Sequence, residues 1–299
     1  MKRKMTTKNL TLFTLLIAGG MFLFSCEAEP TKHTTQEKQS ETPKKEPVKR
    51  QKVKKIFFAI PSPVEMASLI KSSNSKYNND LLNSIDNAKK YTDYKSQALN
   101  LGIYFSDISY SSVFEKTQES ISYLSTIKSM AEDLGIADAI DKDMYNRLEV
   151  NKDNRDSLLT IFSETYWNLN AYLKEEKREE IAAMIIAGGW FEGLYLAVNH
   201  SDNNDKIKER IGEQKYTLKD LSTLIDSYNS TKVSGIKNDL EEMSKIYANV
   251  IIKKESTTKT EENGVVALDN NSELIITEET LKLIKKKVTS IRNSYTKNN

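Results

Sequence analysis

Residues 181–198 read IAAMIIAGGWFEGLYLAV, and this stretch decides the fold. It carries a single charge, Glu192, and approaches the roughly 20 apolar residues that a membrane-spanning helix needs. However, Glu192 stands in its middle together with Gly188, Gly189 and Gly193, and its neighbours have the amphipathic pattern of soluble helices. We therefore interpret the stretch as the buried central helix of a soluble bundle.

The glycines of this stretch predict a close contact between two helices. Glycine inside a helix costs about 1 kcal/mol relative to alanine, and close approach of a neighbouring backbone is the usual compensation. Gly102 lies on another strongly apolar segment, Asp93 to Phe114, and is the candidate partner.

The rest of the chain has the same helical periodicity. Tyr94, Ala98, Leu101, Phe105 and Ile108 follow one another at steps of three and four, as on one helix face. Glycine (10) and proline (5) are scarce for 299 residues, which also favours helices over turn-rich β folds. We predict an all-α fold, an irregular bundle of about nine to ten helices. Helical segments, some of them short, are expected near 62–71, 77–90, 93–114, 121–134, 138–150, 159–173, 181–198, 203–215, from 217, 232–252 and after 277.

One segment interrupts this pattern. Residues 253–276 are expected to form a loop, with a short strand pair around Val265–Leu268 and Leu274–Ile276. The predicted organisation is a signal peptide at 1–25, a lipidated cysteine and disordered tether at 26–55, and a helical domain at 56–299.

The first 26 residues have the order of a secretion signal. Residues 1–9, MKRKMTTKN, are basic, and Leu10 to Ser25 are mostly apolar. The only cysteine of the chain follows directly, in Leu23-Phe24-Ser25-Cys26.

This ending resembles a lipobox, the cleavage and lipidation signal of bacterial lipoproteins. Leu23 and Ser25 fit the aliphatic and small positions of that pattern, whereas Phe24 is larger than usual there. The resemblance implies lipidation of Cys26 and attachment to a membrane of the cell envelope, most consistent with the outer membrane. An uncleaved anchor or a plain secretory signal is the alternative.

Charge separates the leader and tether from the domain. Residues 27–55 hold nine basic and five acidic residues and almost no apolar ones, so they cannot repay the entropy of ordering by burial. Residues 56–299 hold 31 basic and 37 acidic residues, a net charge of −6. A nucleic-acid-binding fold would concentrate positive charge instead, so nucleic acid is not an expected partner.

Stretches such as IPSPVEMASLI, ALNLGIYFSDISYSSVF and GGWFEGLYLA are similar to uncharacterised all-helical lipoproteins of Bacteroidetes. That resemblance spans most of residues 56–299. It implies a fold and a location, and no activity.

The chain offers little for catalysis. It has two histidines, His33 and His200, and no nucleophile, metal-protease, phosphate-loop or dinucleotide motif. We therefore predict no catalytic residues, no metal site and no cofactor.

One set of polar residues is a candidate ligand site. Two helices each carry three polar side chains at positions i, i+3 and i+7, and they would face each other if the helices cross near Gly102 and Gly189. Such groups either satisfy one another, line a ligand pocket or perform acid–base chemistry, because buried polar groups need partners. The six residues are Tyr104, Asp107, Ser111, Glu192, Tyr195 and Asn199.

These observations favour a membrane-anchored, non-catalytic binding or interaction module in the cell envelope. Its expected partners are the membrane, through the lipid anchor, and an envelope protein or a small ligand. The alternatives are a small-molecule-binding lipoprotein with an interhelical pocket and a carboxylate-dependent hydrolase.

Overall fold

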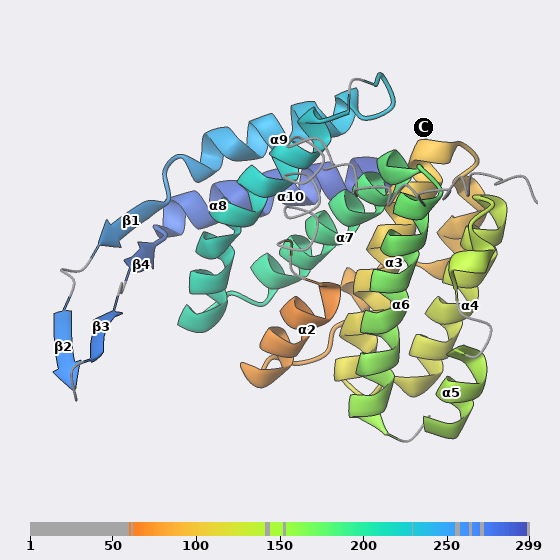
Figure 1. Cartoon of the computed structure of the whole chain (residues 1–299), viewed down its shortest axis with the longest axis horizontal. Helices are drawn as coiled ribbons and strands as arrows, with labels where there is room; N and C mark the ends of the chain where they lie inside the picture. Colours follow the sequence, from red (N-terminus) through yellow and green to blue (C-terminus); the bar gives the residue numbers. More distant parts are fainter. Residues whose placement is uncertain are drawn as a thin grey trace, which may run out of the picture. The chain divides into compact units, whose positions relative to one another are not determined.

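The computed structural model describes residues 60, 62–140, 144–151, 154–228, 230–254, 258–262, 265–269 and 272–297, with backbone only for 252–273. Its architecture is all-α, as predicted (Figure 1). Helices α3 and α7 form the centre of the domain. The helices are α2 (Pro63–Ser72), α3 (Tyr94–Val113), α4 (Thr117–Asp133), α5 (Met144–Asn151), α6 (Arg155–Glu175), α7 (Glu179–Asn199), α8 (Asp205–Asp226), α9 (Ser234–Tyr247) and α10 (Glu278–Thr296).

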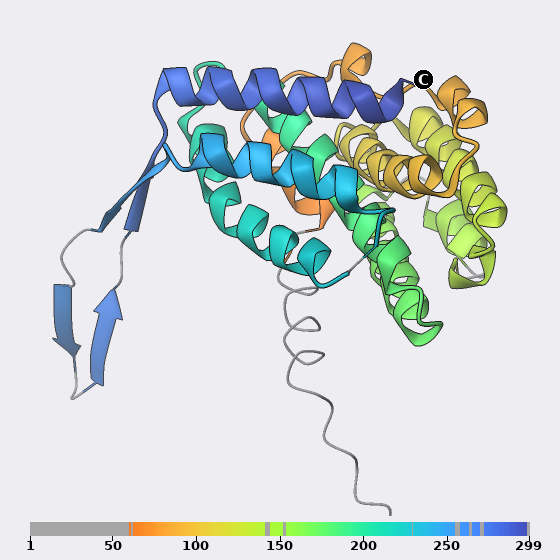
Figure 2. The same ribbon diagram turned by 90° about the horizontal axis from the view of Figure 1, so that it is seen from above.

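The other helices form two groups around this central pair. α4 and α6 pack against α3, with α5 against α6, whereas α8 and α10 pack against α7 and both contact α9 (Figures 1 and 2). In the part of the chain described, α7 is the one helix long and apolar enough to cross a membrane, and 94% of its most apolar window is buried. The other helices therefore cover it, as expected for a core helix.

Glycine allows α3 and α7 to touch backbone to backbone. A β-carbon added at Gly102 would lie 1.9 Å from the carbonyl oxygen of Ile185, and one at Gly188 would lie 2.0 Å from that of Leu99. Both distances are far below any real contact, so no larger residue fits without separating the helices. The predicted close contact is therefore present, with Gly188 even more tightly packed than Gly189.

Several helix ends follow directly from the sequence. Asp93 and Thr277 accept hydrogen bonds from backbone N–H groups at the starts of α3 and α10. Gly135, with a φ of 63°, follows the end of α4, where Ile136 N donates to Ala131 O at 2.8 Å.

The prediction of a helix over 77–90 is wrong. Two short 3₁₀ helices replace it, η1 (Asn79–Leu81) and η2 (Ile85–Lys90). The side chains of Asn78 and Ser84 accept hydrogen bonds from backbone N–H groups two residues further on, which competes with a continuous helix. A third 3₁₀ helix, η3 (Ala137–Ala139), precedes α5.

The predicted break before Thr217 is also absent. α8 continues through this position because its buried stripe does, including Ile211, Leu218 and Leu221. Thr217 itself is buried within the helix and does not begin a new one.

The segment between α9 and α10 contains four strands: β1 (Ile251–Lys254), β2 (Thr258–Glu262), β3 (Val265–Asp269) and β4 (Ser272–Ile275). The two predicted segments are extended, but they do not pair with each other. β3 pairs antiparallel with β2 and β4 with β1, so both lie on the returning arm of one hairpin. The sequence Asn263-Gly264 between β2 and β3 is a strong hairpin signal that would have predicted this pairing.

Candidate functional site

Two carboxyl groups meet inside the domain, as the sequence predicted. Asp107 on α3 and Glu192 on α7 are both fully buried. Each carboxyl shifts the pKa of the other: Glu192 raises the pKa of Asp107, and Asp107 lowers the pKa of Glu192. The two residues therefore lie in one polar seam beside the glycine crossing.

Arg292 of α10 completes this seam. Its Nε donates to Glu192 Oε2 at 2.9 Å and its Nη2 donates to Glu192 Oε1 at 3.1 Å, so the pair is bidentate. Arg292 is 8% exposed, and its Nη2 also donates to the carbonyl of Leu81 at 3.0 Å. Such a buried pair needs this complete set of partners, because both charges have lost their water.

Asp107 has a different environment from Glu192. Its Oδ2 accepts a hydrogen bond from the backbone N–H of Asn83 at 3.1 Å. Its Oδ1 is buried, and no donor faces it in the described residues. A hydrogen bond between the Asp107 and Glu192 carboxyls therefore requires a proton on one of them.

Charge balance places that proton on Asp107. Burial and the neighbouring negative charge of Glu192 raise the pKa of Asp107 well above its usual value, and Arg292 offsets this only in part. Burial also raises the pKa of Glu192, whereas Arg292 opposes that effect by charge and by hydrogen bonding. One guanidinium compensates one carboxylate, so the seam is neutral when Asp107 is a carboxylic acid that donates to an ionised Glu192.

The segment between η1 and η2 closes the seam from outside. The backbone carbonyl of Asn83 accepts from Tyr123 at 3.1 Å, and its side-chain amide donates to Tyr91 at 3.1 Å and Asn100 at 3.2 Å. A continuous helix over this segment would have used the Asn83 N–H internally. The unwound turn instead leaves that N–H free for Asp107.

The other predicted site residues divide into two groups. Tyr195 lies in the seam, where the Arg292 guanidinium stacks over its ring at 4.8 Å. Tyr104 is buried nearby and donates to the carbonyl of Ser84 at 2.9 Å. Burial, with the neighbouring Tyr91 and Asp107, raises the pKa of Tyr104.

Ser111 and Asn199 do not join the seam, which corrects their assignment to it. Ser111 donates to its own helix at Asp107 O, 2.9 Å away, and its hydroxyl oxygen lies 3.2 Å from that of Ser120 on α4. Asn199 donates to the carbonyl of Tyr195 at 2.8 Å. Two crossing helices separate away from their contact point, so residues one or two turns further along face other neighbours.

Arg292 is not among the six residues predicted from the sequence, although a local signal for it was present. Val288, Arg292 and Tyr295 follow one another at steps of four and three, so Arg292 continues the inward stripe of α10. A buried arginine requires a buried acid as its partner, and the sequence predicts two such acids, Asp107 and Glu192.

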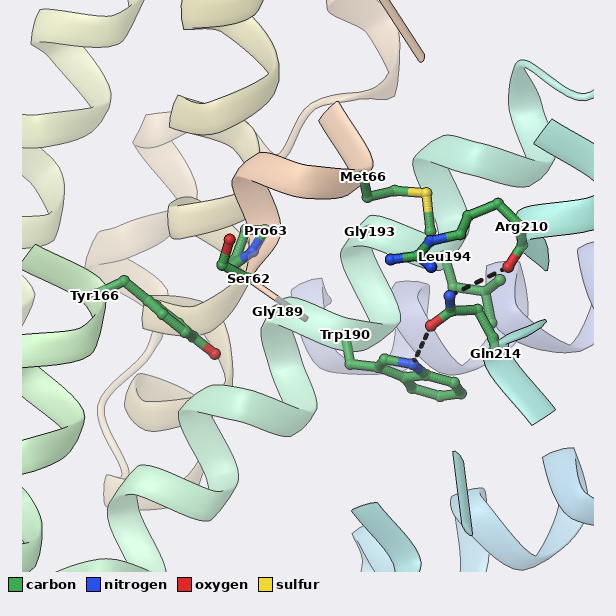
Figure 3. Close-up of a pocket in the computed structure, with 10 residues that line it drawn as sticks. All are labelled: Ser62, Pro63, Met66, Tyr166, Gly189, Trp190, Gly193, Leu194, Arg210 and Gln214. Carbon is green, nitrogen blue, oxygen red and sulfur yellow. Dashed lines mark hydrogen bonds between the residues drawn. The ribbon is translucent and has the colours of Figure 1, made fainter. Parts of the chain in front are cut away.

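A small cavity lies on the α2-facing side of α7 (Figure 3). Trp190 Nε1 donates to Gln214 Oε1 at 3.0 Å, and Gln214 Nε2 donates to the carbonyl of Arg210 at 3.1 Å. The cavity measures about 30 Å³, room for about one water molecule. Its lining residues are Ser62, Pro63, Met66, Tyr166, Gly189, Trp190, Gly193, Leu194, Arg210 and Gln214.

His200 belongs to a separate cluster. Tyr110 accepts from the backbone N–H of Asn78 at 3.0 Å, and its hydroxyl is hydrogen-bonded to His200 Nε2 at 2.8 Å. Burial, together with the charge of Lys285, lowers the pKa of His200 and favours the neutral ring. Within the described residues no three histidine, cysteine or carboxylate side chains gather closely enough to hold a metal ion.

The geometry therefore describes a buried polar network and, beside α2, a cavity too small for a substrate. Comparison with protein-family models, with characterised proteins and with solved structures finds no match to this chain.

Proposed function

We propose that the protein is a lipid-anchored component of the bacterial cell envelope whose helical domain is a non-catalytic binding or interaction module. One observation carries the location. The chain's only cysteine, Cys26, ends an ordered series of basic n-region, apolar stretch and Leu-x-Ser-Cys motif. The predicted signal peptide, lipidated cysteine and tether lie outside the described residues.

The arrangement of the carboxyls supports a non-catalytic role. Glu192 is bound bidentately by Arg292, and Asp107 accepts from the backbone N–H of Asn83. A general acid or base must reach a substrate, and neither group lines the cavity of Figure 3. A surface that contacts another molecule is therefore a better basis for function than this interior.

The proposed anchor predicts a clear loss on mutation. Cys26→Ser should release the protein from isolated membranes and abolish labelling by a palmitate analogue, because the thiol that carries the acyl chain is gone. Ser25→Ala, which keeps a small residue before the cysteine, is the matched control and should stay labelled. Unchanged membrane attachment of Cys26→Ser would overturn the lipoprotein proposal.

The interaction role is tested in the intact envelope. Chemical cross-linking should yield a specific protein partner. Turnover in a broad hydrolase screen, lost in Asp107→Asn or Glu192→Gln variants that still fold, would instead favour the enzyme.

A further inference from the structure

A recess lies where the beginning of α3 meets the end of α10. It measures about 290 Å³, against about 30 Å³ for the cavity of Figure 3. Three lysines and three hydroxyl side chains contribute most of its lining: Lys90, Lys95, Lys297, Thr92, Ser96 and Ser294. We call it the α3–α10 recess.

Its charge is opposite to that of the domain. Among the described residues, none of the three lysines forms an ion pair, although other lysines do, such as Lys208 with Glu278 at 2.5 Å and Lys237 with Asp226 at 2.7 Å. One carboxylate, Asp93, lies in the lining. The lining thus holds three ammonium groups and one carboxylate, in a region of the chain whose net charge is −6. A second carboxylate, Asp239 of α9, lies outside the lining but accepts from the lining residue Tyr295 at 2.5 Å, and the charge of Lys95 acts on it.

Asp93 is already occupied and does not neutralise the lysines. Its Oδ1 accepts from the backbone N–H groups of Lys95 and Ser96, each at 3.0 Å. Burial alone would raise the pKa of Asp93, but hydrogen bonds from Ser96 and Lys95 outweigh it and lower that pKa. The carboxylate is thus committed to capping α3.

The helix ends do not cancel the positive charge either. The end of α10 has a partial negative charge, which favours nearby lysines, but the start of α3 brings a partial positive charge of similar size. Lys95 Nζ lies 2.7 Å from where a β-carbon of Gly235 would be, at the start of α9. The positive end of that helix and the carboxylate of Asp239, one turn further along it, therefore act on this ammonium group with opposite signs.

We propose that the α3–α10 recess binds a phosphate group, as a phosphate monoester or diester. Phosphate oxygens accept hydrogen bonds from both ammonium and hydroxyl groups, and lysine is a common point-charge ligand for phosphate. Lys95 and Lys297 supply the N–H donors, together with Lys90, which keeps one contact to Asn87 Oδ1 at 2.8 Å. The phosphate belongs either to a soluble molecule or to a lipid headgroup. This proposal is independent of lipidation at Cys26.

The test is titration of inorganic phosphate into the full-length chain carrying Cys26→Ser, followed by ³¹P NMR line broadening. We expect saturable broadening, and an affinity about tenfold lower in the Lys95→Ala/Lys297→Ala double variant, since each exposed charge contributes modestly. Lys282→Ala/Lys286→Ala is the matched control, because it removes the same charge from the exposed face of α10 outside the recess. It should change the affinity less than twofold.

The same variants distinguish the source of the phosphate. Flotation with vesicles of phosphatidylglycerol and phosphatidylcholine that requires Lys95 and Lys297, and that phosphate inhibits, assigns the group to a lipid headgroup. Phosphate binding that requires these lysines without flotation assigns it to a soluble molecule. Equal losses in both double variants, or neither broadening nor recess-dependent flotation, would overturn the proposal.

Discussion

Two neighbouring contacts that α7 makes inside the domain differ in how they are stabilised. At Gly188 the contact with α3 is steric, backbone against backbone, and depends on the absence of a side chain. One turn further on, at Glu192, the contact is electrostatic and depends on one arginine and one proton. The first contact tolerates no added atom, whereas the second depends on the balance of charge between its groups.

This difference decides which changes each region can absorb. A steric contact between backbones cannot relax by rotating a side chain, because the opposing atoms belong to the helix itself. A charged seam can relax by gaining or losing a proton, at a cost that depends on pH. Mutations at the crossing should therefore be severe at every pH, and mutations in the seam should be pH-dependent.

The largest effect is expected at the crossing. Gly102→Ala or Gly188→Ala places a β-carbon about 2 Å from a carbonyl oxygen of the facing helix, so the helices must separate and lose packing along their length. We expect a loss of about 4 kcal/mol or more in the free energy of unfolding, measured by urea denaturation.

Gly193→Ala on the same helix is the matched control. An added β-carbon there meets its nearest atom, Met66 Cβ, at 3.8 Å, an ordinary contact. Alanine should then stabilise the domain by about 0.5–1 kcal/mol through helix propensity. Similar losses at Gly188 and Gly193 would show that the backbone contact is not the cause.

A smaller effect, and one that varies with pH, is expected for Arg292→Met. The substitution keeps the apolar volume but leaves Glu192 buried without its cation, which costs about 3–5 kcal/mol. The loss should lessen at low pH, where Glu192 takes a proton. Lys286→Met, exposed on the same helix, should change the unfolding free energy by less than about 0.5 kcal/mol. An Arg292→Met variant with wild-type stability at neutral pH would contradict the seam.

Most of the fold was predictable because residues only a few positions apart in the sequence specify its helices and their ends. The stripes of α3, α4 and α10, the caps at Asp93 and Thr277, and the stop at Gly135 are all readable over a few residues. The helix expected over 77–90 failed because its backbone is used elsewhere, in the bond from Asn83 N–H to Asp107. Tertiary bonds of this kind have no local signal.

The site was predictable only near the crossing. Asp107 and Glu192 were identified because Gly102 and Gly189 fixed where the helices meet. Ser111 lies four residues beyond Asp107, about 6 Å along the axis, where α4 rather than α7 is the neighbour. Arg292 is one hundred residues from its partner Glu192, and no spacing within α10 can specify which acid it meets.

The smallest effect near pH 4, and the sharpest test of the seam, is that of Asp107→Asn. If Asp107 is a carboxylic acid in the folded protein, asparagine reproduces its shape, its acceptor for Asn83 N–H and its donor toward Glu192. Burial, and next the charge of Glu192, raise the pKa of Asp107 in the folded state, so the folded protein binds a proton that the unfolded chain has released above about pH 4. Wild-type stability from this group is therefore complete below pH 4 and falls as pH rises, by at most about 1.4 kcal/mol per pH unit.

Asp107→Asn should match the wild type near pH 4 and become relatively more stable toward pH 8, as measured by urea midpoints across this range. Asp133→Asn, at an exposed position, should run parallel to the wild type throughout. An Asp107→Asn curve that also runs parallel, or that falls further below the wild type as pH rises, would mean that Asp107 is ionised and that Arg292 balances two charges.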